Sequence, residues 1–168
     1  KRMKTTTIIL DHHQINQKII RIAYQIYEAN SSEKEVVIAG IQGNGIYFAE
    51  QLAKSLQQIS SLKIILCEVY IDKKNPLDTI STSIQNIEYK NKPIVLVDDV
   101  LNSGTTLMFG IKYFLDVPLK RFKTAVLVNR NHKKYPVKAD FKGISLSTSI
   151  KEHVEVVFNG EKSKAFLM

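Results

Sequence analysis

The sequence predicts an α/β fold with a mostly parallel sheet of about five strands flanked by helices. Three short runs, 36–41, 94–97 and 124–128, are apolar, rich in β-branched residues and show no polar alternation. Strands that are buried on both faces of a parallel sheet have this character. Segments with apolar residues at helical spacing stand between these runs. This alternation is typical of a sheet that helices cover on both faces.

The remaining elements follow in chain order. Asp11 is suited to cap a first helix, whose apolar stripe consists of Ile15, Ile19, Ile22 and Ile26. Further helices are predicted after the strands at 36–41 and 94–97, where apolar residues resume at helical spacing. The other predicted strands are 62–70, 137–144 and 154–158.

Composition indicates a single globular domain, residues 1–168, with 44% hydrophobic and 24% charged residues. Cys67 is the lone cysteine, so no disulfide can form within the chain, and we expect a reducing cytoplasm. The apolar patch at 8–10 is too short for a membrane span or a signal peptide. The net charge of +8 favours polyanionic partners, either phosphorylated substrates or nucleic acid.

Two adjacent carboxylates, Asp98 and Asp99, follow the buried run at 94–97. Such a pair at the end of a buried strand is costly unless each carboxylate meets water, a metal or a hydroxyl group. The next residues, Asn102, Ser103, Gly104, Thr105 and Thr106, lie between this strand and a predicted helix. Backbone amides, hydroxyl groups and the helix dipole would together form an anion site there. The alternative is an ordinary strand–turn–helix in which Ser103 is the N-cap.

A second loop with exposed backbone amides, Gln42 to Gly45, separates the strand at 36–41 from its helix. Its two glycines also fit a simple tight turn. They begin like a dinucleotide-binding fingerprint, but Phe48 occupies the position of the third glycine. Residues 71–92 form a long polar segment, which is typical of a mobile lid or a binding loop.

The stretch 95–106, VLVDDVLNSGTT, resembles the phosphoribosyl-diphosphate motif of type I phosphoribosyltransferases. In that family an acidic pair faces the ribose hydroxyls and a threonine/serine–glycine loop holds the 5′-phosphate. Further stretches, 9–23, 40–49 and 125–149, resemble one branch, the uracil phosphoribosyltransferase that is also a pyrimidine-operon attenuation regulator. The resemblance covers most of the chain and is poorest at 71–92. It implies the type I fold, with a small hood formed by residues 8–30 and 145–168.

The resemblance also implies a role for each matching residue. Asp98 and Asp99 would be catalytic and would hold Mg²⁺ through water. The 5′-phosphate would bind at Asn102, Ser103, Gly104, Thr105 and Thr106. The diphosphate would bind at Gln42, Gly43, Asn44, Gly45, Lys73 and Lys74, although the two lysines also fit a solvated charge pair. The base would bind at Val128, Asn129 and Arg130.

Three departures from the branch remove charges from these sites. Gln42, Gly43 and Asn44 stand where the branch has lysine, threonine and arginine. Thr105 stands where the phosphate loop has arginine, and Asn129 replaces an aspartate. A charge-assisted contact contributes about 1.5–3 kcal/mol, so we expect weaker turnover or substrate affinity than the branch has.

The expected partners are phosphoribosyl diphosphate and a nucleobase, with uracil first, in a homodimer or larger oligomer and without a membrane. A purine base is an alternative, because the central motif is shared across bases. The main alternative, from another functional class, is a pyrimidine-responsive RNA-binding attenuation regulator with weak or no transferase activity. Between Lys112 and Lys142 there are nine Lys/Arg and two Asp, which could neutralise RNA phosphates or form a solvated basic face.

Overall fold

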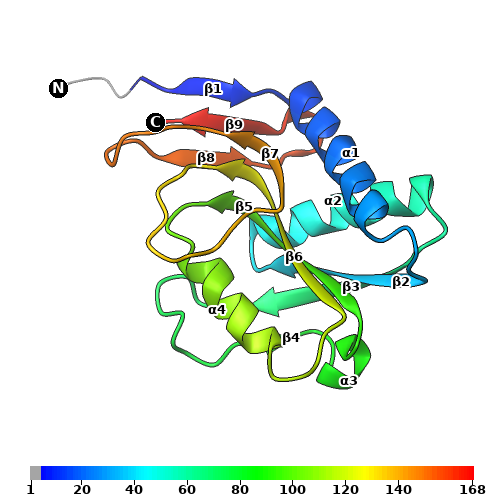
Figure 1. Ribbon diagram of the computed structural model, residues 1–168. Coiled ribbons are helices and arrows are strands. Elements are labelled where there is room, and N and C mark those ends of the chain that lie inside the picture. The colour runs from blue at the N-terminus through cyan, green and yellow to red at the C-terminus, as the bar shows by residue number, and fades with distance from the viewer. Residues whose placement is uncertain (1–4) are drawn as a thin grey trace.

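The computed structural model describes residues 5–168, so residues 1–4 of the predicted domain lie outside the described residues. It contains two sheets (Figure 1). The larger has the order β4-β3-β2-β5-β6-β7, and the smaller has the order β1-β9-β8. The strands β2 to β7 of the larger sheet are Glu35–Ile41, Lys63–Tyr70, Ser81–Thr82, Pro93–Leu101, Arg121–Asn129 and Phe141–Ser145.

The larger sheet confirms the predicted fold class, because β3, β2, β5, β6 and β7 run parallel. Only the two-residue edge strand β4 pairs antiparallel, with β3. β5 is longer than the predicted run 94–97 and continues through Asp98 and Asp99 to Leu101. β7 begins at Phe141 instead of Val137, because its pairing with β6 starts there, at Ala125; just before it, Asp140 N donates to the carbonyl oxygen of Thr124.

Helices cover both faces of this sheet, and each face has its own hydrophobic core. Alternate residues of β2 point to opposite faces, so Val36 and Ile38 join one core while Val37 and Ala39 join the other. The first core packs against α1 (His12–Ala29) and α2 (Asn44–Ile59). The second packs against α3 (Asn86–Tyr89) and α4 (Thr105–Phe114).

α1 begins as the sequence predicts, at Asp11. The Asp11 side chain accepts a hydrogen bond from Gln14 N, and Gln14 Oε1 accepts one from Asp11 N. This reciprocal capping box satisfies amides that the first helical turn leaves free. The four predicted isoleucines of its stripe are all buried. No described helix is long and apolar enough to cross a membrane.

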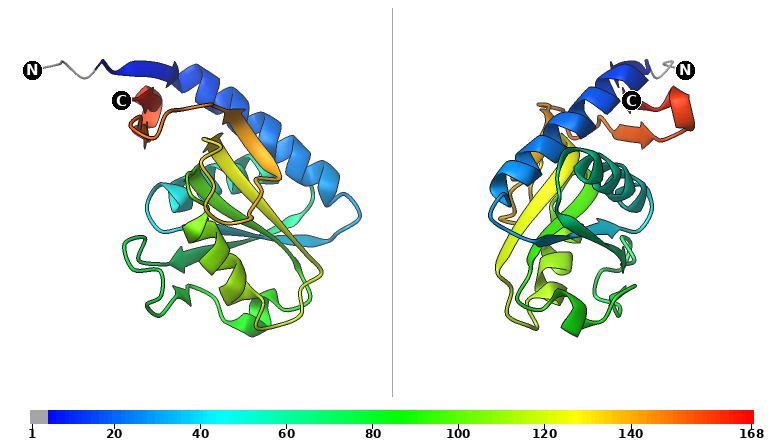
Figure 2. Two further views of the ribbon diagram at one scale, coloured as in Figure 1. Left: turned by 60° about the vertical axis from the view of Figure 1, so that its left-hand side comes forward. Right: turned by 90° about the vertical axis from the view of Figure 1, so that its right-hand side faces the viewer.

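The smaller sheet joins the two ends of the chain at the top of the molecule, far from α3 (Figures 1 and 2). It consists of β1 (Thr7–Leu10), β8 (Val154–Val157) and β9 (Lys164–Leu167), and all its pairs are antiparallel. We call this three-stranded sheet the hood. The sequence pattern predicts β8 but neither β1 nor β9. β1 is four residues long and pairs with β9, near the other end of the chain, whereas β9 is four residues long and its sequence does not alternate between polar and apolar residues.

Candidate active site

A cavity of about 270 Å³ lies where the carboxyl end of β5 meets the hood. Its lining comes from residues 98–107, from Asn44 and Lys73, and from residues 153–156 of the hood. Open α/β sheets bind ligands at this edge, where the polar residues that follow each strand converge. Both aspartates and all five residues of the predicted phosphate loop, Asn102 to Thr106, therefore share one cavity.

The two aspartates have different surroundings within this cavity. Asp98 is 2% exposed, and burial raises the pKa of its carboxyl to about 7. The neighbouring Asp99 raises this pKa further, while Lys73 opposes the rise. The Asp99 side chain is more accessible and accepts a hydrogen bond from Val100 N at 2.8 Å. A buried carboxyl group and a more open one thus stand side by side.

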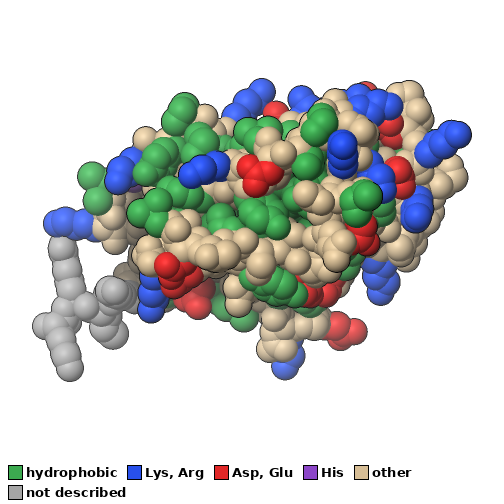
Figure 3. Space-filling view, turned by 90° about the horizontal axis from the view of Figure 1, so that it is seen from below, with side chains coloured by type: hydrophobic (Ala, Val, Ile, Leu, Met, Phe, Trp, Pro, Cys, Tyr) green, Lys and Arg blue, Asp and Glu red, His purple; other side chains and the backbone are tan. Residues whose placement is uncertain are grey.

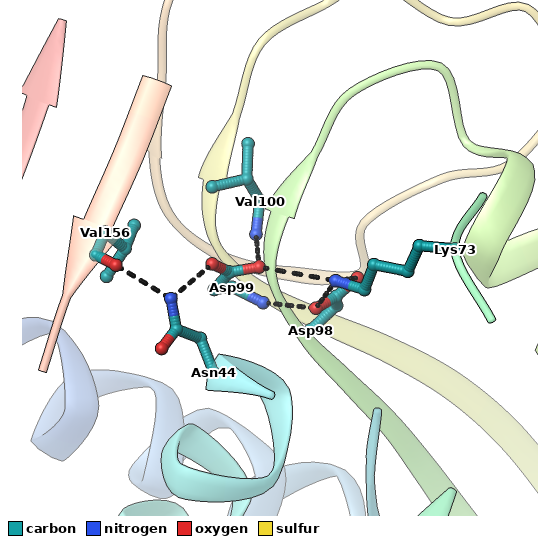
Figure 4. Close-up of polar contacts among 6 residues, drawn as sticks. All are labelled: Asn44, Lys73, Asp98, Asp99, Val100 and Val156. Atoms are coloured by element: carbon teal, nitrogen blue, oxygen red, sulfur yellow. Dashed lines mark hydrogen bonds and ion pairs between the residues drawn. The ribbon is translucent and has the colours of Figure 1, made fainter. Parts of the chain in front are cut away.

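Lys73 reaches both carboxylates from the start of the 71–92 segment (Figure 4). Its Nζ lies 3.1 and 3.2 Å from the two carboxylate oxygens of Asp98 and 3.9 Å from Asp99 Oδ1. The lysine therefore contacts the acidic pair in this structure. Lys74, the other predicted lysine, lines neither this cavity nor the adjoining one.

Asn44 connects the acidic pair to the hood. Its Nδ2 donates to Asp99 Oδ2 at 3.0 Å and to the carbonyl oxygen of Val156 at 2.7 Å (Figure 4). Asn44 is the first residue of α2, so the bridge joins three parts of the chain that are far apart in sequence. The predicted diphosphate residue Asn44 thus has its side-chain amide engaged with Asp99 and the hood.

The predicted phosphate loop, Asn102 to Thr106, leads from β5 into the first turn of α4. Gly104 adopts φ +85°, and α4 begins at the next residue, Thr105. Ser103 Oγ lies 2.8 Å from Thr105 Oγ1 and accepts from Thr105 N at 3.3 Å. The N-cap is Gly104, which lacks a side chain, so the alternative in which Ser103 is the N-cap is wrong. Thr105 and Thr106, the first residues of α4, line the cavity together with Ser103, and the amides of a first helical turn are free to bind an anion.

The second predicted loop borders a cavity of about 480 Å³ next to the first. Gln42, Gly43 and Lys73 are among its lining residues, so Lys73 belongs to both cavities. Gly45 instead packs against β5, where an added Cβ would lie 2.9 Å from the carbonyl oxygen of Val97. Gly43 therefore allows a tight turn, and Gly45 allows the start of α2 to approach β5 closely.

The predicted base-binding residues are buried beside the cavities. Val128, Asn129 and Arg130 are at most 8% exposed, and none of them lines either cavity. Arg130 instead connects loops: it donates to Asn102 Oδ1 at 2.9 Å and to Thr148 Oγ1 at 3.1 Å. Through Asn102 it orients the start of the phosphate loop.

Sequence reasoning missed two residues of the site, His153, which immediately precedes β8, and Glu155, which lies within it. They come to the cavity because β8 crosses above the end of β5. The only local signal is alternation in β8, where Val154 and Val156 are buried and Glu155 is exposed. That pattern shows which face Glu155 occupies but not what lies opposite.

The donor set fits a divalent cation that is shared with a substrate. Among the described residues, no group of three or more His, Cys, Asp or Glu side chains could hold a metal by itself. Asp98 and Asp99 offer carboxylate oxygens in an open cavity. Mg²⁺ is commonly bound by one or two carboxylates together with substrate phosphates, which is the arrangement available here.

Comparison with known proteins identifies the family. A family profile described as "Phosphoribosyl transferase domain" matches residues 5–159. "Bifunctional protein PyrR" of Limosilactobacillus reuteri is 34% identical over 158 residues, which cover 88% of this chain and 89% of the relative. "Bifunctional protein PyrR" of Bacillus pumilus is 32% identical over 169 residues and covers 94% and 93%, respectively.

Solved structures share the fold at lower identity. The hypoxanthine phosphoribosyltransferase of Trypanosoma cruzi superposes with a TM-score of 0.73 at 14% identity and covers 83% of this chain and 81% of that one. A hypoxanthine-guanine phosphoribosyltransferase of Bacillus anthracis gives 0.68 at 18%, with the same coverage of both chains. The cavity at the end of β5, the family profile and the relatives agree: the chain is a phosphoribosyltransferase enzyme of the type I family, in the branch of the bifunctional PyrR proteins.

Proposed function

We propose that this enzyme transfers the phosphoribosyl group of 5-phosphoribosyl 1-diphosphate to uracil with Mg²⁺ present. The products are a nucleoside 5′-monophosphate and diphosphate. One observation carries the proposal: a carboxylate pair and an amide–hydroxyl cradle line the same cavity. A ribose that bears a 5′-phosphate has matching groups, because its hydroxyls donate to carboxylates and its phosphate accepts from amides.

The chain's own residues position the substrate and stabilise the transition state. The first amides of α4 and the hydroxyls of Ser103 and Thr105 bind the 5′-phosphate. Asp99, the more open carboxylate, accepts from the ribose hydroxyls. As the bond from C1 to the diphosphate stretches, positive charge grows on the ribose, and the fixed carboxylates stabilise it. A nitrogen of the base then bonds to C1 as the bond from C1 to diphosphate breaks, and the proton of that nitrogen passes to the departing diphosphate or to water.

The diphosphate half of the site is expected at Gln42 to Gly45, beside Lys73. Mg²⁺ bound at Asp98 and Asp99 would neutralise diphosphate charge and help to orient the leaving group. We propose that the base binds near residues 128–130. We propose uracil as this base because the chain belongs to the branch of the bifunctional PyrR proteins. These three residues are buried and line neither cavity, so the base contacts would come from neighbouring backbone groups.

A base panel tests this proposal. The protein is incubated with phosphoribosyl diphosphate, Mg²⁺ and each of uracil, hypoxanthine, guanine, xanthine, adenine and orotate, and diphosphate release is measured. We expect release with uracil only, and its loss on chelation of Mg²⁺ or in Asp99→Ala. Release with a purine alone would refute the uracil assignment, and full activity of Asp99→Ala would refute the assigned roles.

A second proposed function is RNA binding, which the basic stretch from Lys112 to Lys142 favours. Lys133, Lys134, Lys138 and Lys142 are all exposed. Exposed lysines that neutralise phosphates give an affinity that falls steeply with salt. Filter binding of RNA hairpins at about 50 and 200 mM salt should show this fall and a sequence preference that uridine monophosphate strengthens. Salt-sensitive binding without any sequence preference would contradict a regulatory role.

We also propose a cytoplasmic homodimer. Figure 3 shows hydrophobic side chains gathered across the middle of the face seen from below. Leu77, Ile87 and Leu115 are exposed hydrophobic residues in loop 71–92 and around α4. Monomeric proteins rarely expose large apolar areas, which favours a partner here. Light scattering should give a dimer mass for the wild type and a monomer mass for Leu115→Glu; a monomeric wild type would refute the assembly.

A further inference from the structure

We propose that Lys73 is an exchangeable counter-ion: it neutralises Asp98 and Asp99 in the substrate-free enzyme and moves onto diphosphate oxygens when a divalent cation and substrate bind. The inference rests on the proposed function, because it concerns the same site. It assigns to Lys73 a positioning role with two alternative partners. One partner is seen in the structure, and the other follows from where the lysine stands.

The first observation is the position of the ammonium group. Lys73 Nζ lies 3.1 and 3.2 Å from the two oxygens of Asp98 and 3.9 Å from Asp99 Oδ1. A divalent cation shared by these carboxylates would need the same oxygens. Lys73 and the cation cannot both approach them closely, because two positive charges a few ångströms apart repel each other. Binding of one must therefore oppose binding of the other.

The second observation is the charge of the cavity. Asp98, Asp99 and Glu155 line it, and Lys73 is the one lysine or arginine among its described lining residues. Phosphoribosyl diphosphate is itself a polyanion, so the substrate would meet the carboxylates of Asp98 and Asp99 if nothing neutralised them. A tethered cation limits this repulsion until Mg²⁺ arrives. Gln42 and Asn44 stand where the branch has a lysine and an arginine, so the charge of Lys73 is more important here than in the branch.

The third observation is that the Lys73 side chain has room to move away from Asp98 and Asp99. Its side chain is 43% exposed, whereas that of Asp98 is 3% exposed. It starts in the turn after β3, where Asp72 Oδ1 accepts from Lys74 N at 2.9 Å. It also lines the second cavity, together with Gln42 and Gly43. The ammonium can therefore pass from the acidic pair to the diphosphate side by rotation of its own side chain.

This exchange predicts opposite effects of one substitution on two ligands. Lys73→Gln removes the competitor of the metal, so the free protein should bind Mn²⁺ more tightly. The same change removes a cation from the diphosphate side, so phosphoribosyl diphosphate with Mg²⁺ should bind more weakly. A lysine that only stabilises the fold would not change the two affinities in opposite directions.

The test compares wild type, Lys73→Gln and the matched control Lys90→Gln, which removes the same charge from an exposed position of the same segment. Mn²⁺ binding is followed by electron paramagnetic resonance, and substrate binding by calorimetry. We expect Lys73→Gln to gain at least about fivefold in Mn²⁺ affinity and to lose at least about fivefold in substrate affinity. Lys90→Gln should match wild type, and Asp99→Asn added to Lys73→Gln should abolish the Mn²⁺ gain. Unchanged or absent Mn²⁺ binding in Lys73→Gln overturns the inference.

A second measurement needs no variant and so does not depend on folding of Lys73→Gln. Lysines of the wild type are labelled by reductive methylation and quantified by mass spectrometry, with and without Mg²⁺. The labelling rate of Lys73, relative to Lys90, should rise when Mg²⁺ displaces it. An unchanged ratio at saturating Mg²⁺ contradicts the exchange. Failure of the wild type to bind phosphoribosyl diphosphate at all would instead refute the proposed function, so the two failures are distinguishable.

Discussion

Asp98 and Asp99 are neighbours in sequence, but their surroundings assign them different properties. Asp98 is 2% exposed within β5, and burial raises its pKa from 3.8 to about 7. The Lys73 contact opposes this rise but does not cancel it. An acidic side chain held at such a cost to stability is typical of a functional site.

Replacing Asp98 with asparagine should stabilise the metal-free fold at pH 8. Between about pH 4 and pH 7 the native state keeps a proton that the unfolded chain releases, so wild-type stability falls as pH rises through this window. Asparagine does not titrate, so the variant avoids this loss, which is on the order of 2–4 kcal/mol. Thermal unfolding with a chelator at pH 5 and pH 8 measures it.

Asp116→Asn, at an exposed position, is the matched control and should show no such difference between the two pH values. A stabilisation of Asp98→Asn that is equal at both pH values would contradict the burial argument.

At the residue scale, the sequence predicts the acidic pair and the phosphate loop because they are contiguous, and all of them line the cavity. It does not predict the two contacts that organise them. Lys73 is 25 residues from Asp98, and Asn44 is 55 residues from Asp99. Such contacts depend on which strands are adjacent, and β5 lies next to β2 only in the folded sheet. The roles assigned to individual site residues remain predictions.

β2 and α2 pack closely where the loop Gln42 to Gly45 joins them, and this packing holds the loop at the site. A Cβ at Gly40 would lie 2.7 Å from Ala49 Cβ and from the carbonyl oxygen of Gly45. Backbone atoms cannot move aside as the end of a flexible side chain can, so the added methyl group would clash. Gly40→Ala should therefore lower the free energy of unfolding by about 1–3 kcal/mol. Urea denaturation measures this, and an unchanged midpoint would show that α2 can shift freely.

The loop at Gln42 to Gly45 carries no charged side chain, and a restored cation should improve it. Gln42 is exposed and lines the cavity that we assign to diphosphate. A charge-assisted contact is stronger than a neutral one, so Gln42→Lys should tighten phosphoribosyl diphosphate binding by about fivefold or more. Calorimetry tests this with Gln57→Lys, an exposed position later in α2, as the control. Equal tightening in both variants would indicate a general charge effect instead.

At the element scale, elements with strong local patterns are predictable and those held by distant partners are not. The apolar runs predict β2, β5 and β6, and the isoleucine stripe predicts α1. β9 is missed because Lys164–Leu167 is short, and its pairing with β1 joins opposite ends of the chain. α3 and β4 are missed within 71–92, which the sequence predicts only as a polar loop.

The whole molecule consists of a parallel sheet and a hood with the site between them. Asn44 donates to the carbonyl oxygen of Val156, and hood residues line the cavity, so we expect substrate binding to depend on an intact hood. Ala165 is fully buried in β9, the central strand of the hood. Ala165→Asp would bury an unpaired charge there and should weaken phosphoribosyl diphosphate binding at least about tenfold.

Lys164→Asp, one position away and partly exposed, is the control for this change and should bind nearly as well as wild type. Far-UV circular dichroism should show that the main sheet persists in both variants. Undiminished binding by Ala165→Asp would mean that the hood takes no part in the site.

We propose that the carboxylate pair, Asp98 and Asp99, and the predicted phosphate loop, Asn102 to Thr106, together bind an activated ribose phosphate. This binding is measured by calorimetric titration of phosphoribosyl diphosphate into the protein with Mg²⁺. We predict saturable binding at one site per chain, weakened at least about tenfold in folded Asp99→Ala. No binding by the folded wild type, or equal binding by Asp99→Ala, would refute this shared site.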